Sequence, residues 1–406
     1  MASHLSDVWF QVTDLQVISG RGSWVTTADG AEYLDFSSGI AVTSTGHCHP
    51  KVVAAIQEQA TKFIHAQVNV YRHPLLEQLA DKLAEITPDG IDRFFFANSG
   101  AEATEGAVKL AKQTTGRPNT IVFQGSFHGR THQTMAMTTS KTSYRAGHAP
   151  LPSGIFVAPF PVDDAHADWC LEQVRFLLKA QTAPAETAAI VIEPELGEGG
   201  YLPAPVAFLR GLEEICREHG ILFVADEVQT GFGRTGRMFA VEHYGVRPDV
   251  LVMAKGLGSG FPISAIGASD ELMTRWPRGS HGGTYGGNPI GCAAALATID
   301  VLSEPGFLEN VRARGDQLRA GLVDHQRLDD GIVDVRGWGL MVGSQFADPT
   351  RVAAVQAHCL EEGHLILMNA GTNNDVLRWM PPLVVTEGEI ATALAAFAAA
   401  LKATSP

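Results

Sequence analysis

The sequence has little of what marks exported, membrane-spanning or metal-binding proteins. Its 406 residues include only five cysteines, odd in number and widely scattered, which argues against a disulfide framework and a zinc knuckle. No apolar run approaches the roughly 20 residues that cross a bilayer. The first seven residues form neither the basic nor the apolar region of a signal peptide. We therefore expect a cytoplasmic protein with no membrane partner.

Basic residues are also scarce. Thirty Lys and Arg residues face 44 Asp and Glu residues, and a net charge of -14 would repel a nucleic-acid backbone, so we expect no such partner. The 45% hydrophobic content is ordinary for a soluble enzyme. A chain of this length is longer than the chains that usually fold around a single hydrophobic core. We therefore expect one large domain and smaller structural units around it.

Short apolar runs alternate with helical patterns from about residue 90 onward, which is typical of βαβ units and a mostly parallel sheet. We predict strands at 93–97, 120–123, 189–192, 221–225 and 250–254, and helices at 101–113 and 206–219. Residues 24–34 read as a hairpin outside this sheet, with Asp29 and Gly30 at its turn. Helices at 311–325, 350–362 and 387–402 alternate with strands near Ile332, Leu340 and Val376.

These patterns predict an α/β protein with a mostly parallel central sheet flanked by helices. We expect residues 47–302 to form the large domain. Residues 1–46 and 303–406 would together form a smaller α+β domain.

Two of the predicted strands end next to reactive side chains. Lys255 follows the strand at 250–254, and Asp226 follows the strand at 221–225. A parallel sheet would bring both to one edge. A lysine forms a Schiff base with an aldehyde, and a carboxylate keeps a pyridine nitrogen protonated, so the pair suits pyridoxal phosphate. Without that context, Lys255 would more simply be a solvated charge at a strand end.

Other loops predicted at this edge offer groups for anions and rings. Ser99 and Glu102 have capping-box spacing around Gly100, which favours a phosphate at a helix start or an ordinary capped helix. Phe127 could stack on a ring, and Arg130 could bind a carboxylate or remain a surface arginine.

A further charge lies in an apolar strand. Arg378 would be costly there without a partner, unless the strand is an exposed edge. We expect its partner to be Glu198, an acid in a glycine-rich loop.

Two other patterns are rejected. Residues 231–236 match a dinucleotide-binding motif but open no crossover helix. His47, Cys48 and His49 have no partnering ligands nearby, so we expect a turn there and no metal.

Taken together, the motifs resemble the class III pyridoxal-phosphate aminotransferases, the family of acetylornithine, ornithine and 4-aminobutyrate aminotransferases. The similarity covers nearly the whole chain and implies fold type I. It rests on motifs at 39–42, 46–50, 98–102, 127–131, 226–236, 254–256 and 283–289.

The resemblance implies a set of residues that would hold the cofactor. Lys255 would form the Schiff base and Asp226 would pair with the ring nitrogen. The ring would be contacted by Phe127, Val228 and His128, and its phenolic oxygen by Gln229. The phosphate would be held by Ser99, Gly100 and Ala101. Thr284 would reach the phosphate of a neighbouring subunit, which implies a homodimer with shared active sites. Pairing of dimers into tetramers stays open.

The resemblance also implies how substrates would bind. Arg130 would take the distal carboxylate of an ω-amino acid, and Arg378 the α-carboxylate of 2-oxoglutarate, with Glu198 masking Arg378 while the donor is bound. Lys255 would act as the general base. Glu195 and Leu196 depart from the family's usual apolar residue and glutamine before this glutamate.

Ile40 bears on the donor, because ornithine-specific members carry a tyrosine at its position. The absence of this tyrosine argues against ornithine, while residues 199–201 favour a 4-aminobutyrate-like donor and residues 368–371 resemble the acetylornithine enzymes. The sequence predicts an ω-aminotransferase that moves an amino group from a 4-aminobutyrate-like donor to 2-oxoglutarate by a ping-pong mechanism. Acetylornithine aminotransferase is the alternative within the family. A racemase or aminomutase using the same cofactor is the alternative from another reaction class.

Overall fold

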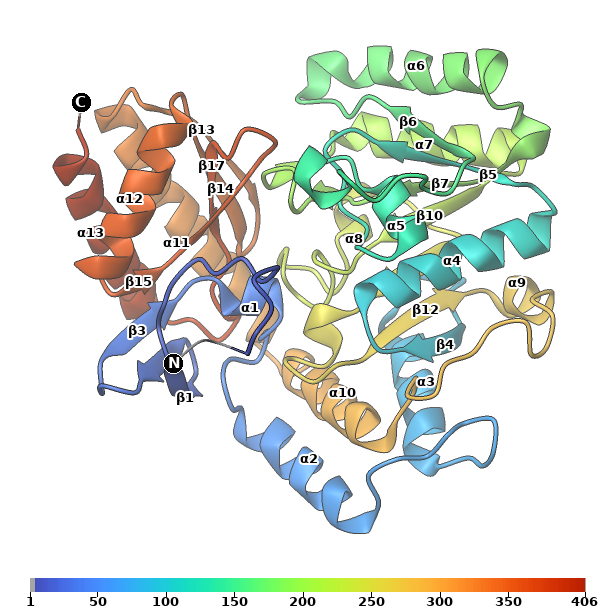
Figure 1. The fold of residues 1–406 in the computed structure, drawn as a ribbon, viewed down its shortest axis with the longest axis horizontal. Helices are drawn as coiled ribbons and strands as arrows, with labels where there is room; N and C mark the ends of the chain where they lie inside the picture. The colour runs from blue at the N-terminus through green and yellow to red at the C-terminus, as the bar shows by residue number, and fades with distance from the viewer. Residues whose placement is uncertain (1–3, 406) are drawn as a thin grey trace.

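The computed structural model describes residues 4–405, which form two lobes of unequal size (Figure 1). Over this range the larger lobe is built on a seven-stranded sheet in the order β4-β12-β11-β10-β7-β5-β6. Its strands are β4 (Arg93–Ala97), β5 (Asn119–Phe123), β6 (Ile155–Ala158), β7 (Thr187–Ile192), β10 (Leu222–Asp226), β11 (Val250–Met253) and β12 (Ser264–Ala268). Neighbours pair in parallel except β12, which is antiparallel to both β11 and β4.

Helices cover both faces of this sheet, which is why its inner strands are apolar along their whole length (Figure 1). The longer ones are α2 (Pro50–Lys62), α3 (Pro74–Ile86), α4 (Gly100–Thr115), α6 (Ala167–Ala180), α7 (Val206–His219) and α10 (Pro289–Leu302). Short helices are α1 (Ser38–Ala41), α5 (His132–Met137), α8 (Val241–Tyr244) and α9 (Asp270–Thr274). Helix α7 ends where Gly220 takes a left-handed conformation, with φ of 58°.

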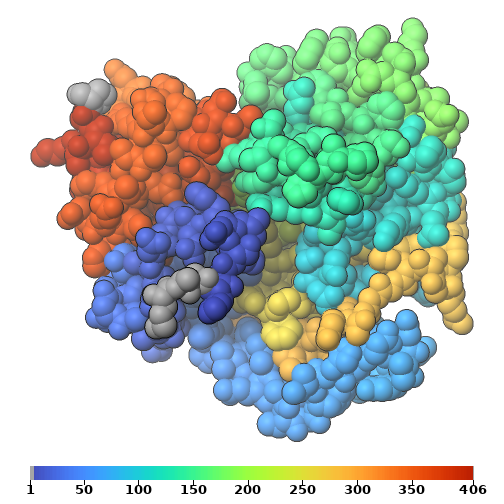
Figure 2. Space-filling view, in the orientation of Figure 1, coloured from blue at the N-terminus to red at the C-terminus, as the bar shows by residue number. Residues whose placement is uncertain are grey.

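The smaller lobe joins the two ends of the chain. Strands β1 (Val17–Arg21), β2 (Trp24–Thr27) and β3 (Glu32–Asp35) form a sheet with β15 (Leu365–Ile366), which pairs in parallel with β3. A second sheet contains β13 (Ile332–Trp338), β14 (Met341–Phe346), β17 (Val376–Trp379) and β16 (Met368–Ala370). Helices α11 (Phe307–Leu328), α12 (Pro349–Glu361) and α13 (Glu387–Ala403) pack beside it. In the space-filling view the N-terminal segment (dark blue) lies directly below the C-terminal part (orange to red), on the same side of the molecule (Figure 2).

The α/β class and the predicted strands and helices are confirmed, with ends that differ by a few residues. Residues 24–34 form the expected hairpin, and Gly30 has φ of 87° at its turn. Strand β12 was not predicted, because its sequence Ser-Ala-Ile-Gly-Ala has few large apolar residues. At Gly267 there is no room for a side chain, because a Cβ atom would lie 2.5 Å from Ile91 and 2.9 Å from Phe94.

The two rejected motifs have structural roles. Arg234, within the segment 231–236, is buried and donates to the main-chain oxygens of Leu340 and Pro381 in the smaller lobe. His47 contacts Asp35 at 2.8 Å, and His49 caps helix α2. Arg234 therefore ties the two lobes together.

Between residues 4 and 405, no single helix is both long and apolar enough to cross a bilayer. Helices α10 and α11 reach the length and apolar composition of a membrane span only when they are joined across a bend of 71°.

Candidate active site

A cavity of about 470 Å³ opens where β10 and β11 end. Segments that follow β4, β5, β7, β10 and β11 contribute to its wall, as expected at the carboxyl edge of a parallel sheet. The wall includes Ser99, Gly100, Ala101, Phe127, His128, Arg130, Glu193, Asp226, Val228, Gln229 and Lys255. The structure thus brings together most of the residues that the sequence singles out.

Lys255 faces this cavity from a constrained backbone. Its φ is 42°, a left-handed conformation that is unfavourable for a residue with a Cβ atom. Within residues 4–405 its amine has no hydrogen-bond or ion-pair partner. Removal from water lowers the pKa of Lys255 to about 8, and the charge of Glu198 opposes that shift. About a tenth of this amine is therefore neutral, and hence nucleophilic, at pH 7, far more than for an ordinary lysine.

Asp226 ends β10 and pairs with Val252 of the adjacent parallel strand β11, so it lines the same cavity as Lys255, which follows that strand. One carboxylate oxygen contacts Nδ1 of His128 at 2.6 Å, and the other accepts from the Val228 N–H at 3.1 Å. Burial opposes protonation of His128, but the hydrogen bond to Asp226 and its charge outweigh burial and raise the pKa of His128. The pair holds a carboxylate at the cavity with a fixed orientation.

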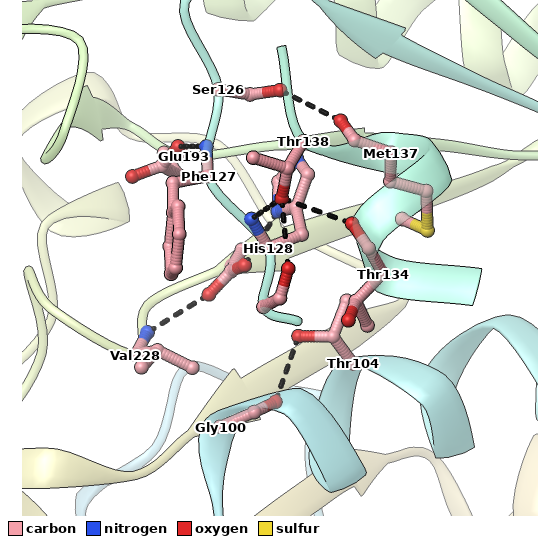
Figure 3. A network of polar contacts seen from close by, with 12 residues as sticks. Gly100, Thr104, Ser126, Phe127, His128, Thr134, Met137, Thr138, Glu193 and Val228 are labelled. Atoms are coloured by element: carbon pink, nitrogen blue, oxygen red, sulfur yellow. Dashed lines mark hydrogen bonds and ion pairs between the residues drawn. The ribbon is translucent and has the colours of Figure 1, made fainter. Parts of the chain in front are cut away.

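Glu193, which the sequence analysis did not select, positions the aromatic wall. Its carboxylate accepts from the Phe127 N–H at 2.7 Å (Figure 3). It also accepts from the Gly197 N–H at 2.9 Å. Burial raises the pKa of Glu193 to about 7. The Phe127 ring and the Val228 side chain both line the cavity, so a planar group between them would meet apolar surface on each side.

The start of helix α4 offers free hydrogen-bond donors. Glu102 accepts from the N–H groups of Asn98 and Ser99, while Ser99 Oγ accepts from Glu102. In the described chain the N–H groups of Gly100 and Ala101 have no acceptor. Helix starts of this kind bind phosphate through their free amides and the helix dipole.

Gln229 provides a second group without a partner. Its Oε1 is buried and has no hydrogen bond within residues 4–405. A buried polar atom of this kind usually has a partner, so Gln229 can serve a bound polar ligand.

The two arginines that the sequence assigns to carboxylates are in different states. Arg378 is buried in β17 and donates to Oε1 of Glu198 at 2.5 Å, so these two side chains pair as expected. Arg130 lines the cavity, is exposed and has no carboxylate partner in the described range. One guanidinium is therefore free and the other is masked.

The two residues that depart from the family motif are accommodated by packing. Leu196 is buried, and a Cβ on Gly125 or Gly199 would lie within 3.0 Å of it. Glu195 is buried with no hydrogen-bonding side chain around its carboxyl group, and burial raises its pKa well above the ordinary value. The Glu198–Arg378 pair forms despite both changes.

Four predicted site residues are outside the wall of this cavity: the paired Glu198 and Arg378, and also Ile40 and Thr284. Ile40 is 37% exposed with φ of 65°, and Thr284 is exposed. Neither belongs to the cavity wall.

Comparisons with known proteins agree with this geometry. The model of the class III aminotransferase family matches residues 6–401. A 5-aminovalerate aminotransferase of Pseudomonas putida is 41% identical over 95% of this chain and 93% of its own length. A probable 4-aminobutyrate aminotransferase of Bacillus subtilis is 36% identical over 95% of this chain and 92% of its own length. An acetylornithine aminotransferase of Archaeoglobus fulgidus is 42% identical over 91% of this chain and 91% of its own length.

Solved structures of transaminases share the fold. The ornithine aminotransferase of Toxoplasma gondii superposes with a TM-score of 0.90 at 28% identity, covering 98% of this chain and 93% of its own. A PLP-bound amine transaminase from an uncultivated Pseudomonas species superposes with a TM-score of 0.91 at 27% identity. The match covers 100% of this chain and 98% of that one. The chain therefore belongs to the class III aminotransferase family, has the fold type I architecture and is a transaminase.

Proposed function

We propose that the protein is a pyridoxal-phosphate-dependent ω-aminotransferase that takes linear ω-amino acids such as 4-aminobutyrate as donors and 2-oxoglutarate as acceptor. The observation that carries this proposal is the contrast between Arg130 and Arg378. A donor with one carboxylate needs only the free Arg130. An acceptor with two carboxylates also needs Arg378, which becomes available when Glu198 moves away.

The cavity residues fit pyridoxal phosphate, because the wall combines unpaired hydrogen-bonding groups with an oriented carboxylate and an amine. The amides of Gly100 and Ala101 would hold the phosphate, Asp226 the ring nitrogen and Gln229 the phenolic oxygen, with Lys255 at the aldehyde. When bound, the group supplies an electron sink for the substrate carbon. Once substrate has displaced it, Lys255 Nζ would take the proton from that carbon and carry it to the bound group within the same half-reaction. With the keto acid acceptor, Lys255 would carry a proton in the reverse direction.

The names of the relatives support two kinds of donor. The 5-aminovalerate and 4-aminobutyrate enzymes favour a linear ω-amino acid. Acetylornithine aminotransferase is the second candidate, because several relatives of that name are 41–42% identical. Both kinds of donor present a carboxylate that the free Arg130 could bind.

A donor panel with 2-oxoglutarate tests the proposal. We expect the highest kcat/KM for 4-aminobutyrate or 5-aminovalerate, a lower value for N-acetylornithine and β-alanine, and the lowest for ornithine. A clear preference for N-acetylornithine would establish the second candidate instead. Turnover that does not depend on any keto acid would point to the racemase or aminomutase alternative.

The reactivity of Lys255 should follow its lowered pKa. Only the neutral amine attacks an aldehyde, so capture should rise with pH around a midpoint near 8 and level off above it. The measurement uses cofactor-free protein and a small aromatic aldehyde without titrating groups, trapped with borohydride and located by mass spectrometry. Exposed lysines in the same spectra are the internal reference. A midpoint near 10.5 at Lys255 would contradict the expectation.

We also propose a homodimer in which Thr284 completes the partner's site, because Thr284 is exposed and lies outside the cavity wall of its own chain. Lys255→Ala and Thr284→Asp proteins should each be impaired alone. Co-expressed, they should regain activity, since a mixed dimer has one site with both native residues. Mixed dimers as inactive as the Lys255→Ala protein would exclude the shared site.

A further inference from the structure

Tyr144 contacts both carboxylate-binding parts of the site, although the proposed function gives it no role. It ends the short 3-10 helix Thr142–Tyr144 between α5 and β6. The guanidinium carbon of Arg130 lies 4.6 Å from the centroid of its ring. Its hydroxyl donates to Oε2 of Glu198 at 3.4 Å, and its ring meets that of Phe127 edge-on at 5.3 Å between centroids. One side chain therefore bridges the free arginine and the acid that masks the other arginine.

The contact with Arg130 orients a cation without using its hydrogen-bond donors. Across residues 4–405, the stack on Tyr144 is the one contact found for the Arg130 guanidinium. A ring face attracts the cation and fixes its plane, while the N–H groups remain at the edge for a carboxylate. An unrestrained arginine would lose more side-chain freedom on binding.

The contact of Tyr144 with Glu198 helps to keep Glu198 paired with Arg378. Oε1 of Glu198 is held by Arg378, and Oε2 by the hydroxyl of Tyr144. Burial and the charge of Glu198 raise the pKa of Tyr144, so its hydroxyl keeps the proton that it donates. Movement of Glu198 away from Arg378 must break both contacts.

We propose that Tyr144 is a positioning residue that sets how readily the site accepts a dicarboxylate relative to a monocarboxylate. Its ring orients Arg130 for either ligand, and its hydroxyl restrains Glu198 on Arg378. This inference rests on the proposed function, which assigns both arginines to substrate carboxylates. A dicarboxylate binds only the fraction of molecules in which Glu198 has left Arg378. A change that makes the Glu198–Arg378 contact less stable raises this fraction, and the affinity for the dicarboxylate rises by the same factor.

Two variants separate the two contacts of Tyr144. Tyr144→Phe keeps the ring and removes the hydroxyl, whereas Tyr144→Leu removes both. The probes are glutarate and pentanoate, which cannot react, titrated into the holoenzyme by calorimetry. Glutarate should bind Tyr144→Phe about three- to tenfold more tightly than wild type. Pentanoate affinity should be unchanged in Tyr144→Phe and about two- to fivefold weaker in Tyr144→Leu.

Tyr33→Phe is the matched control, because the Tyr33 ring stacks on His364 in the smaller lobe, and the change should alter neither affinity. In turnover, Tyr144→Phe should lower KM for the keto acid acceptor while KM for the donor stays constant. Equal glutarate affinity in wild type and Tyr144→Phe, or equal pentanoate affinity in wild type and Tyr144→Leu, would overturn the inference. If glutarate binding responds as stated but 2-oxoglutarate is not turned over, the proposed acceptor is wrong and the role of Tyr144 stands.

Discussion

Replacement of Lys255 by alanine should reduce kcat by roughly 10³- to 10⁴-fold or more. The variant loses both the amine that would bind the cofactor's aldehyde and the base that would move the substrate proton. The cavity wall otherwise stays intact, because the Lys255 amine makes no hydrogen bond or ion pair within residues 4–405. Single-turnover kinetics with saturating cofactor and donor measure the loss directly.

Lys51→Ala is the control for this experiment. Lys51 is an exposed lysine paired with Glu304, so its removal should leave kcat close to the wild-type value. A small primary amine added to Lys255→Ala should restore part of the activity if proton transfer is what is missing. Turnover by Lys255→Ala within tenfold of wild type would refute the assignment of Lys255.

Asp226→Asn should lower kcat by about 10² or more, the second largest effect that we expect. The amide cannot hold a protonated pyridine nitrogen as a carboxylate does, and the change removes the charge that helps to raise the pKa of His128. Folding should be retained, because the amide oxygen can still accept from the Val228 N–H. Steady-state kinetics and thermal unfolding of the same preparation separate the two effects.

Asp249→Asn offers a matched comparison. Asp249 is also an acid next to β10, but its carboxylate accepts from the Phe223 N–H at the far end of the strand, away from the cavity. We expect this variant to change stability more than kcat. Similar losses of kcat in both variants would mean that Asp226 acts only through the fold.

The sequence predicted the meeting of Lys255 and Asp226 because it depends on local patterns. Apolar runs of strand length define β10 and β11, and parallel pairing then places their ends at one edge. The same reasoning missed β12, which lacks a run of large apolar residues and whose Gly267 packs closely against Ile91 and Phe94.

Contacts between distant segments were harder to predict. Glu193 binds the main chain of Phe127, which lies 66 residues earlier, and His128 contacts Asp226 across 98 residues. Tyr144 lies in a loop with no distinguishing pattern, so only its position against Arg130 reveals it. The glycine motif around Arg234 could be excluded as a dinucleotide site, but its link between lobes is visible only in the folded chain.

The pairing of β3 with β15 has a consequence for how the protein is made. Leu34 and Leu365 are partners in that ladder, so the first hairpin leaves the ribosome long before the strand that covers its edge. At typical elongation rates this interval is on the order of tens of seconds. During translation an open strand edge is a template for pairing with other nascent chains. We therefore expect chaperone occupancy of nascent chains to persist until β15 has been synthesised.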